Sequence, residues 1–305
     1  MKKIFTLICC ILFQHFLFAQ TEVISGVSNA IMLEADGNDL YITQTDPTHK
    51  ITKIDVTAAS PSLIDVSNPL YIGYALLLNG QDMLVVNSGF SRISKLDLTG
   101  TLPVSPSDVV LGLTDPYDMV LNGNDLYVSE WSNGRISKAN LTDNPPTASI
   151  VIDIDGQFGS DYIRALELKG NDLYLGLQNR IAKIDITSAN PTLVDVVTHS
   201  ENWIPDLLFV GNDLYFPLVS QGKISKINIT ESNPTIVDVV TGLTTNPRGM
   251  ARIGTDLYFV DGTSIKKIAL TSLSVEEVDS NATIKLYPNP SNDHILLSNL
   301  NKMYT

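Results

Sequence analysis

The sequence predicts an all-β fold of six similar modules, and a repeated string carries that prediction. The pattern Gly-[Asn/Gln/Thr]-Asp-[Leu/Met]-[Tyr/Leu] occurs six times, at intervals of 43, 43, 47, 41 and 43 residues. Its copies begin at Gly37, Gly80, Gly123, Gly170, Gly211 and Gly254. No stretch after Gln20 has a sustained helical period, so strands are expected throughout. Self-similarity at such a period is typical of repeat architectures.

Each repeat contains four short strands. The first runs into the Gly-Asp turn and the second follows it, as in residues 119–121 and 126–128. Glycine suits this turn because the tight hairpin turns require positive φ. Third strands recur as Ile-[Ser/Thr/Ala]-Lys-x-[Asp/Asn] at 51–55, 93–97, 136–140, 181–185 and 224–228, with a looser copy at 265–269. Fourth strands are predicted at 63–66, 108–110, 150–154, 193–197 and 236–240.

Four strands repeated at about 40 to 45 residues are typical of a blade that buries its faces only against neighbouring blades. We therefore expect a six-bladed β-propeller of four-stranded blades. Residues 22–27 parallel residues 238–243, which predicts that the N-terminal segment is the outer strand of the sixth blade. Residues 275–278 are an alternative for the same place.

The N-terminal segment has the pattern of a secretory signal peptide. Lys2 and Lys3 precede an apolar run at 4–18, and the small residue Ala19 follows. We expect residues 1–19 to be the signal peptide, 20–279 the propeller, and 280–305 a linker and partial sorting segment. Both cysteines, Cys9 and Cys10, fall in the signal peptide, so no disulfide is expected afterwards. The predicted location is secreted or at the cell surface, reached through the periplasm, and no later segment is long enough to cross a membrane.

The charge of the chain excludes one class of partner. Twenty Lys and Arg residues stand against 33 Asp and Glu residues, for a formal net charge of −13. Nucleic-acid binding requires clustered basic residues on phosphates, so we expect no nucleic-acid partner. The lysines of the third strands occur once per blade and so do not form a patch.

One blade carries a resemblance to known propellers most clearly. It contains Asp-Pro-Tyr-Asp-Met at 115–119, Gly-Asn-Asp-Leu-Tyr-Val at 123–128 and Gly-Arg-Ile at 134–136. Over residues 21–279 the chain resembles the NHL, YWTD and gluconolactonase-like group of six-bladed propellers, and also streptogramin-lyase-like blades. That resemblance implies the architecture and leaves the activity open, because these families include both binding modules and enzymes.

The C-terminal segment contains Leu-Tyr-Pro-Asn-Pro-Ser-Asn-Asp at 286–293, followed by an alternating segment at 294–297. Pro-Asn-Pro is a stiff turn, and a strand is expected after it. The string resembles the opening of a C-terminal sorting domain of the type IX secretion system of Bacteroidetes. The resemblance implies export machinery as a partner, although the family's domain continues through more strands than this chain has.

The two rims of the propeller differ in sequence. The repeated rim consists of the Gly-Asp turns and the connections from third to fourth strands, which are alike in every blade. The variable rim consists of the second-to-third connections and the links between blades, and it holds the aromatic and charged residues. Variable loops on a repeated frame usually carry binding. The candidate ligand-binding residues there are Tyr117, Asp118, Glu130, Trp131, Arg164, Trp203, Asp206 and Arg248.

Two alternatives for these residues stay open. The aromatic rings fill the central channel in one, and Asp–Arg pairs neutralise each other around that channel in the other. We assign no catalytic residue, no metal ligand and no cofactor. A calcium ion near residues 153–161 is a weaker hypothesis, because the spacing and final Glu of an EF-hand are missing.

We expect a non-catalytic secreted module that binds a glycan, peptide or protein partner through its variable rim. One alternative is a metal-dependent lyase or lactonase acting at the central channel through Asp118, Asp206 and their neighbours. Another is a structural or adhesive module of the cell surface.

Overall fold

The computed structural model describes residues 20–45, 47, 49–70, 74–154, 162–243 and 246–270, together with short strands at 286–288 and 295–297. The chain divides into two compact units, Met1–Ala269 and Leu270–Thr305. The predicted signal peptide at 1–19 and the alternative outer strand at 275–278 lie outside the described residues. Residues 155–161, most of the proposed calcium loop, lie outside them too.

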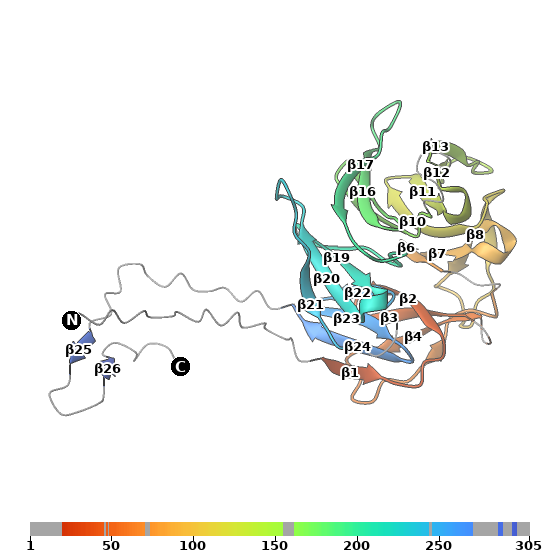
Figure 1. Ribbon diagram of the computed structural model, residues 1–305. Helices are drawn as coiled ribbons and strands as arrows, with labels where there is room; N and C mark the ends of the chain where they lie inside the picture. The colour runs from red at the N-terminus through yellow and green to blue at the C-terminus, as the bar shows by residue number, and fades with distance from the viewer. Residues whose placement is uncertain are drawn as a thin grey trace. The chain divides into compact units, whose positions relative to one another are not determined.

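Six four-stranded antiparallel sheets make up the first unit and surround a common axis, as Figure 1 shows. From the axis outward, blade 1 contains β2 (Ala30–Asp36), β3 (Asp39–Gln44), β4 (Lys50–Asp55) and β5 (Ile64–Asp65). Blade 2 contains β6 (Leu76–Asn79), β7 (Asp82–Asn87), β8 (Arg92–Asp97) and β9 (Ser107–Leu111). Blade 3 contains β10 (Pro116–Asn122), β11 (Asp125–Glu130), β12 (Arg135–Asn140) and β13 (Ser149–Asp153). Blade 4 contains β14 (Ala165–Lys169), β15 (Asp172–Gly176), β16 (Arg180–Asp185) and β17 (Val194–Thr198). Blade 5 contains β18 (Leu208–Val210), β19 (Asp213–Leu218), β20 (Lys223–Asn228) and β21 (Val237–Val240). Blade 6 contains β22 (Met250–Ile253), β23 (Asp256–Asp261), β24 (Ser264–Ala269) and, as its outer strand, β1 (Thr21–Ile24). The predicted six-bladed β-propeller is confirmed.

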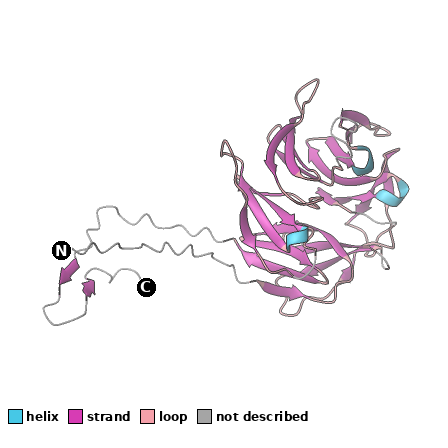
Figure 2. Cartoon of the chain, in the orientation of Figure 1, coloured by secondary structure: helices cyan, strands magenta, loops and turns pink. Residues whose placement is uncertain are grey.

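Strands dominate the regular structure, as Figure 2 shows. The helices of the described residues are three single 3₁₀ turns, η1 (Ser88–Phe90), η2 (Trp131–Asn133) and η3 (Val219–Gln221). Each lies on the variable rim, between the second and third strands of blades 2, 3 and 5. No helix in the described part of the chain has the length and apolarity that crossing a membrane requires.

The ring closes in the sixth blade, where both ends of the propeller meet. Strand β1 pairs antiparallel with β24, with Thr21 opposite Lys267, so the predicted N-terminal outer strand is confirmed. Near the axis, the Gly249 N–H donates to the Ile31 carbonyl at 2.7 Å and joins blade 6 to blade 1. A Cβ atom on Gly249 would lie 2.4 Å from Cα of Met32, so this approach of two backbones requires glycine.

The repeated rim is built by the same contacts in every blade. The six glycines of the Gly-Asp turns have φ between +58° and +66°, as the hairpin turn requires. The Asp of each turn forms an ion pair with the third-strand lysine of its own blade, with Nζ 2.6 to 3.2 Å from a carboxylate oxygen. The pairs are Lys53–Asp39, Lys95–Asp82, Lys138–Asp125, Lys183–Asp172, Lys226–Asp213 and Lys267–Asp256.

The hydrophobic core lies between neighbouring sheets. One cluster, for example, packs Val120, Tyr127 and Ile136 of blade 3 against Leu166 and Leu173 of blade 4. Such a blade buries its apolar face only when its neighbour is present, so the free energy of burial is shared between modules. The fold is therefore a ring in which each blade depends on the next.

In the second unit, β25 (Leu286–Pro288) pairs antiparallel with β26 (Ile295–Leu297). The strand expected after Pro-Asn-Pro is thus present at residues 295–297. The assignment of this unit to a sorting domain stays a prediction.

Candidate functional site

The register of the inner hairpins shows which residues occupy equivalent positions around the axis. In every blade, the second-strand residue at the end of the Gly-Asp pattern pairs with one residue of the first strand, for example Tyr127 with Val120. Three residues before that first-strand residue, each blade has a residue that lies where the first strand leaves the variable rim. We call these six residues, one from each blade, the entrance ring. They are Ile31, Tyr74, Tyr117, Arg164, Pro205 and Arg248.

Aromatic rings and two arginines of the variable rim contact one another. The rings of Tyr74 and Tyr117 are stacked with centroids 4.4 Å apart. The Arg164 guanidinium lies 5.0 Å from the ring centre of Trp131, 4.8 Å from that of Trp203 and 5.8 Å from that of Tyr117. The two predicted tryptophans, far apart in sequence, therefore meet at one side chain.

Arg248 and Tyr162 extend this group on either side. The Arg248 guanidinium lies 5.6 Å from the Trp203 ring centre, and Tyr162 packs on Trp131 at 5.3 Å. We call the whole group the aromatic–arginine cluster; it comprises Tyr74, Tyr117, Trp131, Tyr162, Arg164, Trp203 and Arg248. Five of the eight predicted site residues belong to it.

The two arginines of the cluster differ from others of the propeller in their partners. Arg92, Arg135 and Arg180 each form an ion pair with an Asp of the neighbouring fourth strand. Within the described residues, neither Arg164 nor Arg248 forms an ion pair, and the buried Nε of Arg164 has no hydrogen-bond partner. Their positive charges face aromatic rings instead, which attract a cation without neutralising it.

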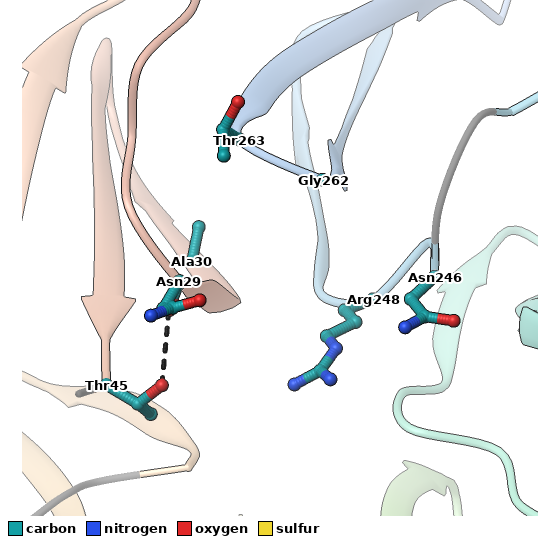
Figure 3. Close-up of a pocket in the computed structure, with 7 residues that line it drawn as sticks. All are labelled: Asn29, Ala30, Thr45, Asn246, Arg248, Gly262 and Thr263. Atoms are coloured by element: carbon teal, nitrogen blue, oxygen red, sulfur yellow. Dashed lines mark hydrogen bonds between the residues drawn. The ribbon is translucent and has the colours of Figure 1, made fainter.

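A pocket of about 370 Å³ opens beside Arg248 between blades 6 and 1, as Figure 3 shows. Its lining comes from the start of β2, the end of β3, the link before β22 and the turn between β23 and β24. The lining residues are Asn29, Ala30, Thr45, Asn246, Arg248, Gly262 and Thr263. None of these described lining residues is acidic, and the nearby Asp261 carboxylate binds Lys266 Nζ at 2.6 Å. The pocket is therefore polar, with a single cationic side chain in its wall.

Asp118 and Asp206 occupy equivalent positions, as the sequence suggests, but they are buried and join blades. The Asp118 carboxylate accepts backbone N–H groups of Met119 and of Leu166 in blade 4, both at 2.7 Å. The Asp206 carboxylate accepts the Met250 N–H of blade 6 at 2.5 Å. Burial raises the pKa of Asp118 to about 7 and also raises the pKa of Asp206 well above its ordinary value, against the opposing effect of these hydrogen bonds.

Two further axial carboxylates, which were not among the predicted site residues, also join neighbouring blades. Glu34 accepts the Leu78 N–H of blade 2 at 3.2 Å, and Glu167 accepts the Phe209 N–H of blade 5 at 3.3 Å. Burial raises the pKa of each to about 7. Both occupy the first-strand position opposite the repeated Tyr, so an alignment of the repeats would have found them.

Glu130 directly precedes Trp131, but its carboxylate has partners outside the aromatic–arginine cluster. Its carboxylate accepts the Thr114 N–H at 2.7 Å and the Ser137 hydroxyl, both in or beside its own blade. Gln44 makes the equivalent contact with Thr52 in blade 1 at 3.0 Å. Glu130 thus has the contacts of a residue that holds the second strand to the third.

A shared metal site does not emerge from the acidic residues that the structure describes, because no three His, Cys, Asp or Glu side chains among them are grouped to hold an ion. Asp153, at the start of the proposed calcium loop, pairs with Arg135 at 2.7 Å.

The fold and the cluster define a six-bladed β-propeller with an aromatic and cationic variable rim. No family model matches the sequence. No curated protein matches it either. The solved structures similar to it include virginiamycin B lyase from Staphylococcus aureus (TM-score 0.59, 15% identity, 83% of this chain and 99% of that chain) and a streptogramin B lyase (TM-score 0.60, 17% identity, 83% and 98%). A chain of a nidogen–laminin complex is similar as well (TM-score 0.58, 12% identity, 73% and 84%). Likeness at these identities establishes the propeller fold and nothing about activity.

Proposed function

We propose that this protein is a non-catalytic binding module that holds a glycan, peptide or protein partner on the aromatic–arginine cluster and the pocket beside Arg248. One observation carries the proposal. The variable rim brings Trp131, Arg164 and Trp203 of three separate segments into contact, although none of them belongs to the repeated pattern. Aromatic and arginine side chains are enriched at binding hot spots, where their large surfaces and fixed donors favour recognition.

The contrast with the repeated rim supports a role in binding. Contacts that only build a blade recur in each blade, as the Lys–Asp pairs do. The contacts of the aromatic–arginine cluster occur only once among the described residues. The Arg164 guanidinium in it has no carboxylate partner among those residues. An arrangement that adds no repeated stability is expected where a scaffold carries a function.

The test is binding to glycan and peptide arrays by the intact protein, its Trp203→Ala variant and its Lys138→Met variant. We expect Trp203→Ala to weaken any specific binding at least tenfold, because Trp203 contacts both arginines of the cluster. Lys138→Met lies on the repeated rim and should bind like the parent protein. Circular dichroism and melting temperature show whether each variant is folded. Specific binding that Trp203→Ala leaves unchanged, or that Lys138→Met removes, would contradict the proposal.

A lyase or lactonase acting at the channel is the second candidate, and Asp118 is the observation that favours it. A carboxyl with a pKa of about 7 suits general acid or base catalysis near neutral pH. A solved structure similar in fold is a catalytically inactive histidine-to-alanine variant of virginiamycin B lyase with quinupristin. Both Asp118 oxygens, however, hold backbone N–H groups, so the scaffold accounts for this residue. Turnover of quinupristin or of simple lactones by the protein, lost in Asp118→Asn, would favour the enzyme instead.

We further propose that the module works outside the cell. The support is the sequence pattern of residues 1–19 and the Tyr-Pro-Asn-Pro string at 287–290.

A further inference from the structure

Most cations of this propeller are matched by carboxylates in two repeated sets. The first set is the Lys–Asp pair of the repeated rim, present in six blades. In the second set, the first residue of the third strand pairs with a fourth-strand Asp at 2.6 to 2.9 Å in five blades. Its members are Lys50–Asp65, Arg92–Asp108, Arg135–Asp153, Arg180–Asp195 and Lys223–Asp238. Outside both sets, Lys266 pairs with Asp261, and Lys169 and Arg252 donate to backbone carbonyls. In a chain with a net charge of −13, the two described cations that remain require an explanation.

Arg164 and Arg248 lie outside both sets, in the entrance ring of blades 4 and 6. The rings of Tyr117, Trp131 and Trp203 surround Arg164, and no described residue accepts a hydrogen bond from its buried Nε. Aromatic faces fix the guanidinium in position, but they do not satisfy its five N–H donors. A guanidinium held this way is prepared for an anion with planar, paired oxygens, such as a carboxylate.

Arg248 presents the same chemistry to the pocket. Figure 3 shows its guanidinium extending between Asn29 and Thr45 on one side and Asn246 on the other. The other polar side chains of the lining are neutral amides and hydroxyls, which both donate and accept hydrogen bonds. The volume of about 370 Å³ is within the range of roughly 300–1,000 Å³ usual for small-ligand sites.

We propose that the pocket beside Arg248 binds the carboxylate of an acidic sugar, a uronic acid unit of a glycan. This inference rests on the proposed binding function and names the ligand class. Arg248 holds the carboxylate, and Asn246 and Thr263 meet the hydroxyl groups of the same ring. Arg164 contacts the same Trp203 ring as Arg248 and is placed to meet a second acidic unit of the glycan. A uronic acid fits this lining better than an acidic peptide does, because it combines one carboxylate with several hydroxyls on a compact ring.

The experiment compares trigalacturonate with its methyl ester, in which each carboxylate becomes an uncharged ester, by titration calorimetry with the full protein. We expect trigalacturonate to bind at least tenfold more tightly than the ester, with an affinity that falls as salt rises. Arg248→Gln should remove at least tenfold of the affinity for trigalacturonate and little of that for the ester. Asn246→Asp, which adds a like charge beside the carboxylate, should weaken trigalacturonate in the same selective way.

Arg92→Gln is the matched control, because Arg92 belongs to the second repeated set and lies 2.6 Å from Asp108. It should leave the affinity for trigalacturonate unchanged. The melting temperature of each variant shows whether it is folded, and Asn246→Asp keeps the test decisive where Arg248→Gln does not fold.

Three results separate failure of this inference from failure of the proposed function. Equal binding of the ester and the acid, with loss in Trp203→Ala, would overturn the acidic-sugar inference and leave the binding function in place. Binding of a hexaglutamate peptide in preference to trigalacturonate, lost in Arg248→Gln, would overturn the sugar class. No binding of either sugar probe would overturn the inference, and no specific binding on the arrays would overturn the proposed function as well.

Discussion

The repeated rim and the variable rim of this propeller distribute charge in different ways. On the repeated rim, each blade matches its own charges: the Lys138–Asp125 pair is found again in the other five blades, and the lysine also lies over a Tyr ring in five of the six. On the variable rim, Arg164 meets rings from other blades and, among the described residues, no carboxylate. One rim therefore specifies the module, and the other combines the modules into a single surface.

The axial carboxylates between the rims link four of the six pairs of neighbouring blades. Glu34, Asp118, Glu167 and Asp206 join blades 1 to 2, 3 to 4, 4 to 5 and 5 to 6 by accepting a backbone N–H. Gly249 connects blade 6 to blade 1 through its own N–H. The ring thus uses side chains at four junctions and close backbone contact at the closure.

Gly249→Ala tests the closure and should have the largest effect on stability. An added Cβ would lie 2.4 Å from Cα of Met32 and 2.6 Å from the Ile31 carbonyl oxygen, and neither backbone atom can rotate away. Such overpacking should lower the free energy of unfolding by about 3 kcal/mol. Denaturant unfolding followed by circular dichroism measures it.

Gly254→Ala is the matched control on the repeated rim. The space around Gly254 is open, but its φ is +59°, so the cost is that of the left-handed backbone alone, about 1 kcal/mol. Equal effects of the two substitutions would contradict a close backbone contact at Gly249.

Much of the fold follows from the sequence because the repeat reports on local structure. The six Gly-Asp turns predict the hairpins, and the likeness of residues 22–27 to 238–243 predicts the closing strand, which is found at Thr21–Ile24. Boundaries are less predictable. The fourth strand of blade 1 spans only Ile64–Asp65 instead of 63–66, because the Ser67 hydroxyl accepts the Ile51 N–H in place of a regular ladder.

The site follows less completely, because its contacts join residues that no repeat relates. The sequence places Trp131, Trp203, Arg164 and Arg248 on one rim, and the structure brings them into contact. Which ring lies beside which guanidinium depends on ring closure, which sequence spacing does not encode. The sequence also cannot separate a carboxylate that binds a neighbouring backbone, such as Asp118, from one that faces a ligand.

The axial carboxylates and the carboxylates of the repeated rim should have opposite effects on how stability depends on pH. The pKa values of Glu34, Asp118 and Glu167 are raised to about 7 in the fold, so between their ordinary values near 4 and pH 7 the folded protein holds protons that the unfolded chain has released. Their contribution to stability is present at low pH and is lost as the pH rises through about 7. We expect the melting temperature to fall by about 3 °C or more between pH 5 and pH 8.

Two substitutions assign that response to its residues. Glu34→Gln keeps an oxygen for the Leu78 N–H and removes the charge, so it should reduce the fall between pH 5 and pH 8. Hydrogen bonds from Thr99 lower the pKa of Asp97 on the repeated rim, so its contribution is lost as the pH falls below its ordinary value. Asp97→Asn should therefore leave the fall in melting temperature between pH 5 and pH 8 unchanged. A smaller fall in this variant would contradict its assignment to the axial carboxylates.

Replacing a single cation on each rim should have the smallest effect on the free energy of unfolding. The two replacements compare the two rims directly. Lys138→Met removes a partly exposed ion pair with Asp125 and should lower the free energy of unfolding by less than about 1 kcal/mol. Arg164→Met removes a cation that no described carboxylate neutralises, and methionine still packs on the surrounding rings. Its effect should be within about 0.5 kcal/mol of zero. If Arg164→Met instead destabilises the protein more than Lys138→Met does, Arg164 is a structural plug of the channel, and the cluster is part of the scaffold rather than a surface kept for a ligand.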